Sequence, residues 1–176
     1  MRMCVCVCVF NPCVCVKKTK IMSTKSPTEE THVCITNCGP VDILSSKDRH
    51  KYLGRMFTGD FSTRSKTAID HRLACAWMKF KAFQHAFEDK HVNVKLRLKL
   101  FDSIITSTVL YGLDTVPLTY QMLNRIDIAQ RIMLRRIVGW VNYADDTWEE
   151  SGHRMAERLR QCLALRPVKN WSECIN

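Results

Sequence analysis

Two adjacent carboxylates, Asp145 and Asp146, are the side chains of this sequence best suited to chemistry. They follow Tyr143 and Ala144, and such a pair can hold two Mg²⁺ ions so that a hydroxyl attacks a phosphate in line. The chemistry also needs a further carboxylate from another strand. Asp42, in the stretch Val-Asp-Ile-Leu, is the candidate with apolar strand neighbours.

The residues around this acidic pair favour a structural role. A catalytic hairpin needs an apolar strand after its aspartates, whereas this chain continues with the polar stretch Thr-Trp-Glu-Glu-Ser-Gly-His-Arg-Met. Thr147 and Glu150 form a capping box, the pattern that begins a helix, and the helix dipole stabilises acidic residues placed before it. No Gly-rich substrate-binding segment lies between Asp42 and Asp145. We therefore expect a helix cap here, and neither a catalytic nor a metal site.

Ten cysteines raise the question of disulfides or zinc, but half of them lie in the first 15 residues, where Cys and Val alternate. This run is typical of a translated dinucleotide repeat, and its Cys-x-Cys spacing offers only a weak clamp for a soft metal. A signal peptide is disfavoured because Asn11-Pro12 interrupts the run and no small-residue cleavage site follows. We expect residues 1–31 to be a disordered tail. The other cysteines indicate reduced thiols in an intracellular protein, of the cytoplasm or nucleus.

The net charge of +10 is concentrated in the middle of the chain. Residues 47–99 carry 13 Lys and Arg against 5 Asp and Glu, whereas residues 1–46 carry 5 against 3 and residues 100–176 carry 9 against 9. A concentrated basic stretch favours a polyanionic partner, of which nucleic acid is the commonest, over an ordinary solvated face. No window approaches the roughly 18 uninterrupted apolar residues of a membrane span, so we expect no membrane partner.

Short β-prone runs precede the helical part of the chain. Val33–Thr36 and Val41–Leu44 flank the turn residues Asn37–Pro40, which predicts a hairpin. A third short strand is expected at His50–Leu53, and it ends at Gly54.

From Ser62 onward, the apolar residues follow the helical period and predict four amphipathic helices. Asn93, Thr119 and Thr147 begin the last three, and Gly112, Gly139 and Pro167 end them. The residues expected on the buried faces are Ile69, Leu73, Ala76, Phe80, Phe83 and Phe87, then Val94, Leu98, Phe101, Ile105 and Val109, then Met122, Ile126, Ala129, Met133 and Ile137, and finally Trp148, Met155, Leu159 and Cys162. Asp127 and Arg131 are expected to pair on the wet face of the third helix. The predicted fold is mostly α, in an α+β arrangement: a small β-hairpin element followed by about four helices.

Three short motifs follow one another along this framework: Tyr52-Leu53-Gly54, Leu110-Tyr111-Gly112 and the stretch Leu-Arg-Arg-Ile-Val-Gly at residues 134–139. In this order and at these separations, they resemble the end of the reverse transcriptase of non-LTR retrotransposons, over roughly residues 40–160. No single motif is specific. In that family, the Tyr-Leu-Gly motif forms a hairpin that grips the primer strand just after the palm, and the thumb helices follow.

The resemblance implies a truncated reverse-transcriptase fragment that lacks the catalytic palm. Tyr143-Ala144-Asp145-Asp146 has the form of the family's catalytic metal-binding motif, but it follows the thumb helices here, whereas in the family it precedes the primer grip. We therefore expect no catalysis, no cofactor and at most weak, sequence-independent binding to an RNA or DNA backbone. The missing palm domain is a further expected partner. The alternative is a divergent Mg²⁺-dependent RNA-directed DNA polymerase that uses Asp42, Asp145 and Asp146.

The expected organisation has four parts: a tail and linker at residues 1–31, a primer-grip-like hairpin element at 32–60, a thumb-like helical bundle at 61–166 and a C-terminal tail at 167–176. The residues expected to contact nucleic acid lie in the basic stretch, and they are Lys51, Tyr52, Gly54, Arg55, Lys79, Lys81, Lys95 and Lys99.

Overall fold

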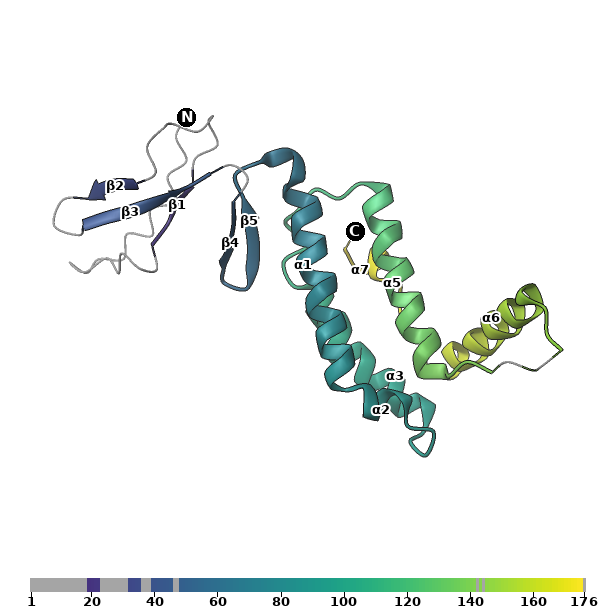
Figure 1. Ribbon diagram of the computed structural model, residues 1–176. Helices are drawn as coiled ribbons and strands as arrows, with labels where there is room; N and C mark the ends of the chain where they lie inside the picture. Colours follow the sequence, from purple (N-terminus) through teal and green to yellow (C-terminus); the bar gives the residue numbers. More distant parts are fainter. Residues whose placement is uncertain are drawn as a thin grey trace. The chain divides into compact units, whose positions relative to one another are not determined.

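The computed structural model describes residues 19–22, 32–35, 39–45, 48–141, 143 and 145–175. The chain divides into two compact units, residues 1–68 and 69–176 (Figure 1). The tail expected at residues 1–31 lies outside the described residues, except for residues 19–22.

The first unit begins with a three-stranded sheet. β2 (His32–Ile35) and β3 (Gly39–Leu44) are antiparallel, with Val33 opposite Val41, which confirms the two predicted strands. Gly39 and Pro40, predicted as part of the turn, belong to β3 instead, and the rest of that turn lies outside the described residues. β1 (Ile21–Met22) pairs in parallel with β3. The expectation of a disordered linker is therefore wrong at these two residues. A two-residue strand forms through pairing with its neighbour β3, and it is too short to show an alternating pattern of its own.

A separate two-stranded hairpin follows in the first unit. β4 (Arg49–Tyr52) matches the third predicted strand, and it pairs antiparallel with β5 (Arg55–Thr58). The two-residue turn between them has Leu53 at φ 46° and Gly54 at φ 76°. Positive φ at both central residues is the type I′ geometry, which matches the twist of paired strands. β5 was not predicted because Arg-Met-Phe-Thr does not alternate apolar and polar residues.

Helices make up the rest of the chain, which confirms the mostly α fold class. They are α1 (Phe61–Ala82), α2 (Gln84–Glu88), α3 (Val94–Phe101), the π-helical turn η1 (Asp102–Thr106), α4 (Ser107–Leu110), α5 (Tyr120–Val138), α6 (Trp148–Leu165) and α7 (Trp171–Ile175). This is more than the four expected, because Phe83 separates α1 from α2, η1 interrupts the second predicted helix, and α7 is additional. No helix in the described part of the chain combines the length and apolar character that crossing a membrane requires.

The predicted helix ends agree closely with the structure. The side chain of Asn93 accepts a hydrogen bond from the Lys95 backbone N–H at 2.9 Å. Thr119 caps α5 in the same way, and Thr147 with Glu150 forms the complete capping box of α6. Gly139 ends α5 at φ 84°, and Gly112 follows the end of α4 at φ 73°.

Most of the predicted buried positions form the core of the helical unit. Ile69, Phe80, Phe87, Leu98, Phe101, Ile105, Ile126, Met133 and Ile137 are all at most 1% exposed. Two predicted positions are wrong. Phe83 is 39% exposed because α1 has already ended there, so the residue leaves the stripe. Trp148 is 83% exposed because it starts α6 at the surface, where its ring stacks on Trp140 at a centroid distance of 6.2 Å.

The last described residues, for which the sequence predicts only a tail, form α7 beside α5 (Figure 1). Trp171 is fully buried, its backbone N–H donates to Gln130 Oε1 at 3.0 Å, and its indole Nε1 donates to Thr106 Oγ1 at 3.0 Å. Asp127 accepts hydrogen bonds from the backbone N–H and hydroxyl of Ser172. The predicted Asp127–Arg131 pair is therefore wrong, because Asp127 instead binds the first turn of α7.

A buried arginine holds three segments of the helical unit together. Arg97 on α3 is 9% exposed. Its Nε donates to the carbonyl oxygen of Val92 at 3.1 Å, and its Nη1 donates to the carbonyls of Phe87, at 3.2 Å, and of Ile137. Phe87 and Ile137 lie in the last turns of α2 and α5, where carbonyl oxygens have no donor within their own helix. One guanidinium therefore satisfies the ends of two helices.

Replacing Arg97 by Met is expected to lower the free energy of unfolding by about 2–4 kcal/mol, because it leaves interior carbonyl oxygens without a charged donor. Lys99→Met on the same helix is the matched control, since Lys99 is exposed, and it should change stability by about 0.5 kcal/mol or less. Urea unfolding followed by circular dichroism measures both. Equal losses for the two variants would contradict this role of Arg97.

Candidate nucleic-acid interface

The tip of the β4–β5 hairpin exposes an aromatic and an aliphatic side chain between two cations. Tyr52 is 43% exposed and Leu53 is 71% exposed. Lys51 is exposed on β4, and the guanidinium of Arg55 lies 5.5 Å from the ring centre of Phe57, which Tyr52 contacts edge-on. The type I′ turn fixes Gly54 between them. The structure thus gathers four predicted residues, Lys51, Tyr52, Gly54 and Arg55, at one end of one hairpin.

Lys79 and Lys81 lie near the end of α1, and their surroundings differ. The Lys79 ammonium donates to the hydroxyl of Thr108 at 2.9 Å, which ties it to α4. Lys81 is exposed. Lys81 can therefore reach an external anion freely, whereas Lys79 must share its donors with Thr108.

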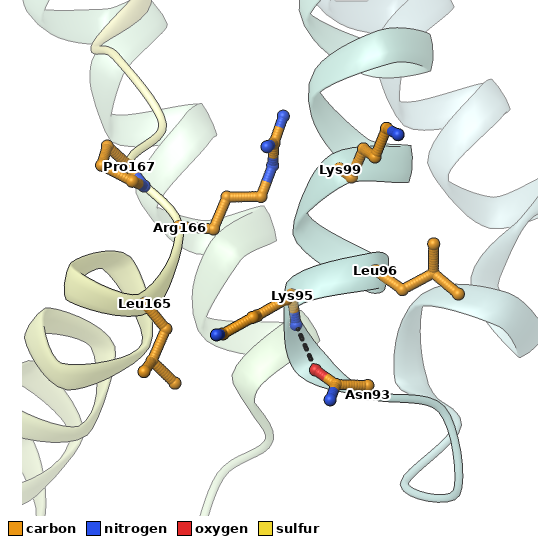
Figure 2. A pocket seen from close by; sticks show the side chains of 7 residues that line it. All are labelled: Asn93, Lys95, Leu96, Lys99, Leu165, Arg166 and Pro167. Atoms are coloured by element: carbon orange, nitrogen blue, oxygen red, sulfur yellow. Dashed lines mark hydrogen bonds between the residues drawn. The ribbon is translucent and has the colours of Figure 1, made fainter.

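Lys95 and Lys99 lie one turn apart on α3, and both are exposed. They line a shallow pocket together with Asn93, Leu96, Leu165, Arg166 and Pro167, and Figure 2 shows the Lys95 side chain extending toward the end of α6. Arg166 is a cation that the sequence analysis did not select. Its only local signal is its place after the last helical turn and before Pro167, and the sequence does not show that α6 ends beside α3.

The acidic segment before α6 is used to fix the start of that helix. Asp146 pairs with the guanidinium of Arg154 and accepts a hydrogen bond from the Tyr143 backbone N–H at 3.1 Å. Arg154 also lies over the Tyr143 ring, 4.4 Å from its centre. The hydrogen bond from Arg154, assisted by that from Tyr143, holds the pKa of Asp146 below its usual range. Asp145 is exposed, and Asp42, on β3, pairs with Lys20.

Across the described ranges, no three His, Cys, Asp or Glu side chains gather where they could hold a metal ion. Asp42 and Asp146 each have a basic partner, and the hydrogen bond and charge of Lys20 lower the pKa of Asp42. What the geometry does offer is cationic and apolar surface at the hairpin tip and along α3, which suits a phosphate backbone.

Replacing Asp146 by Asn is expected to lower the Tm at neutral pH, because Arg154 loses its anionic partner. The folded pKa of Asp146 lies below its ordinary value of 3.8, so the stabilisation is fully present above that value and is lost as the pH falls through the folded pKa. The difference in Tm between parent and variant should therefore vanish in strong acid. Thermal melts across pH test this, with Asp145→Asn as the control. A difference that does not change with pH would contradict it.

The chain is similar in sequence to a transposon-derived protein. The chain is 25% identical to an uncharacterized transposon-derived protein of Caenorhabditis elegans, F52C9.6, over 122 residues. The match covers 69% of this chain and 42% of that protein, so the chain spans less than half the length of its relative. No protein-family model and no solved structure matches the chain. What the comparisons establish is therefore similarity to a transposon-derived protein.

Proposed function

We propose that this chain derives from a retroelement reverse transcriptase and contains a primer-grip-like hairpin followed by thumb-like helices. In this proposal it binds the backbone of RNA or DNA without regard to sequence and catalyses no reaction itself. The observation that carries the proposal is the β4–β5 hairpin, in which the Tyr52-Leu53-Gly54 motif forms an exposed tip flanked by Lys51 and Arg55. The first long helix, α1, begins three residues after β5.

The positions of the other two motifs support the proposal. Leu110-Tyr111-Gly112 falls where α4 ends, and the motif at residues 134–139 is the last part of α5 together with its terminal Gly139. Both glycines have positive φ, which side-chain-bearing residues adopt at a cost. The motifs thus coincide with helix ends in the thumb-like part, and the similarity to a transposon-derived protein is in keeping with a mobile-element source.

The cations supply the binding chemistry in this proposal. Lys51, Lys81, Lys95 and Lys99 are all exposed, and no carboxylate lies within ion-pair distance of them among the described residues. Free lysines can contact phosphate oxygens, and such contacts release condensed counterions without reading the bases. A palm domain is the proposed protein partner, because in the resembled family the palm lies directly before the primer grip.

A primer-extension assay separates the proposal from the alternative polymerase. The purified chain is expected to extend no primer on RNA or DNA templates with Mg²⁺ or Mn²⁺, because Asp146 is committed to Arg154 and Asp42 to Lys20. Extension above background that is abolished by Asp145→Ala would overturn the proposal and establish an enzyme that uses Asp42, Asp145 and Asp146.

Binding is expected to be electrostatic. Affinity for oligonucleotides should fall about a hundredfold between 50 and 200 mM salt if roughly four phosphates are contacted. Lys95→Glu with Lys99→Glu should weaken RNA and DNA of any sequence alike, measured by fluorescence anisotropy across a salt series. Arg131→Glu with Arg135→Glu, the same charge change on the exposed side of α5, is the control and should weaken binding less. A flat salt dependence or a strong sequence preference would contradict the proposal.

A further inference from the structure

We infer that the pocket between α3 and the end of α6 holds one phosphate of a nucleic-acid backbone, and that Arg166 is its principal contact. This inference rests on the proposed function and deepens it, because it assigns a specific phosphate position and a residue outside the predicted set. The pocket combines Lys95 and Lys99 of α3 and Arg166, which follows α6, with two leucines, Leu96 and Leu165 (Figure 2).

Among the described residues, only Arg166 of the three cations has an ion-pair partner, and that contact is long. The ammonium groups of Lys95 and Lys99 have no hydrogen-bond or ion-pair partner in the described part of the chain. Arg166 Nη2 is 3.9 Å from Asp102 Oδ2, which is too long for a hydrogen bond. Three positive charges therefore line one concave surface, and Asp102 offsets them only weakly.

Arg166 Nε gives an independent indication that an acceptor is missing. This atom is buried, yet it has no hydrogen-bond partner among the described residues. A buried N–H without an acceptor is unfavourable, and native structures rarely leave one unpaired. If the guanidinium turns toward the pocket opening, this N–H can donate to a phosphate oxygen, and a guanidinium can give two parallel bonds to one phosphate.

The backbone of Arg166 is held in place before any ligand binds. α6 ends at Leu165, and Arg166 has extended backbone with φ −150° and ψ 104°. Its N–H donates to the carbonyl of Cys162 at 3.3 Å, and Pro167 prevents the helix from continuing. In Figure 2 its side chain extends from this point alongside α3. Only the end of the side chain has to be ordered on binding, which lowers the entropic cost.

The apolar part of the pocket favours a nucleotide chain over a free anion. Leu96 is 56% exposed and Leu165 is 55% exposed, and both lie beside the cations. An inorganic phosphate would use the cations alone. A backbone phosphate carries a sugar on each side. The C–H groups of these sugars can cover the leucines and remove them from water.

The direct test compares Arg166→Gln with Arg158→Gln in the full chain. Both substitutions remove one cation, Arg158 within α6 and Arg166 directly after it, but Arg158 is exposed and does not line the pocket. Arg166→Gln is expected to weaken single-stranded and duplex oligonucleotides about tenfold and to lower the salt slope by about one, whereas Arg158→Gln should weaken them about twofold or less. Equal effects would overturn the inference and leave the proposed function standing. No binding by the parent chain would instead refute the proposed function.

A second pair of variants tests the inference if Arg166→Gln unfolds under the conditions of the binding assay. Asp102→Asn is expected to tighten oligonucleotide binding about threefold, because it removes the carboxylate nearest Arg166, and Asp114→Asn, on an exposed loop, should tighten it less. Equal effects of these two would also overturn the inference.

Competition by inorganic phosphate at constant ionic strength tests the ligand class. Displacement of the oligonucleotide by phosphate at micromolar concentration would mean a free-anion site instead.

Discussion

The helical unit depends on the buried guanidinium of Arg97. Short helices such as α2 and α3 are too short to be stable alone, so tertiary contacts must supply their stability. Arg97 joins the ends of α2 and α5 and the loop at Val92 through carbonyl oxygens, which are neutral acceptors. No carboxylate among the described residues forms an ion pair with this guanidinium, so its donors are used on helix-end carbonyls. The hydrophobic residues around it, above all Phe87 and Leu98, then pack against fixed helix ends.

The features of the fold that could be predicted from the sequence depend on residues close together along the chain. Asn93 and Thr147 cap helices through hydrogen bonds to residues two or three positions away, so their signal lies within one short window. Met133 and Ile137 are buried because the helical period alone places them on one face. Arg97, Trp171 and Arg166 could not be predicted in this way. Their partners lie between 5 and 65 residues away for the first two, and the third depends on where α6 meets α3.

The same distinction applies to the candidate interface. The hairpin residues at 51–55 could be found because the turn keeps them adjacent in space as well as in sequence. Charge counting selected lysines that are exposed, such as Lys95, but it could not show that Lys79 donates to Thr108. The basic residues counted in the middle of the chain also include Arg97, whose side chain is buried. A cation's role is set by the acceptors around it, and those come mainly from other elements.

The turn at Leu53 holds a residue that its backbone conformation does not favour. A leucine at φ 46° adopts a conformation that glycine or asparagine would adopt more easily, at a cost of about 1 kcal/mol or more. Replacing Leu53 by glycine or asparagine would therefore relax the turn, and the exchange would remove little buried apolar surface because Leu53 is 71% exposed. The hairpin tip thus presents an apolar side chain to solvent on a backbone that favours a smaller residue.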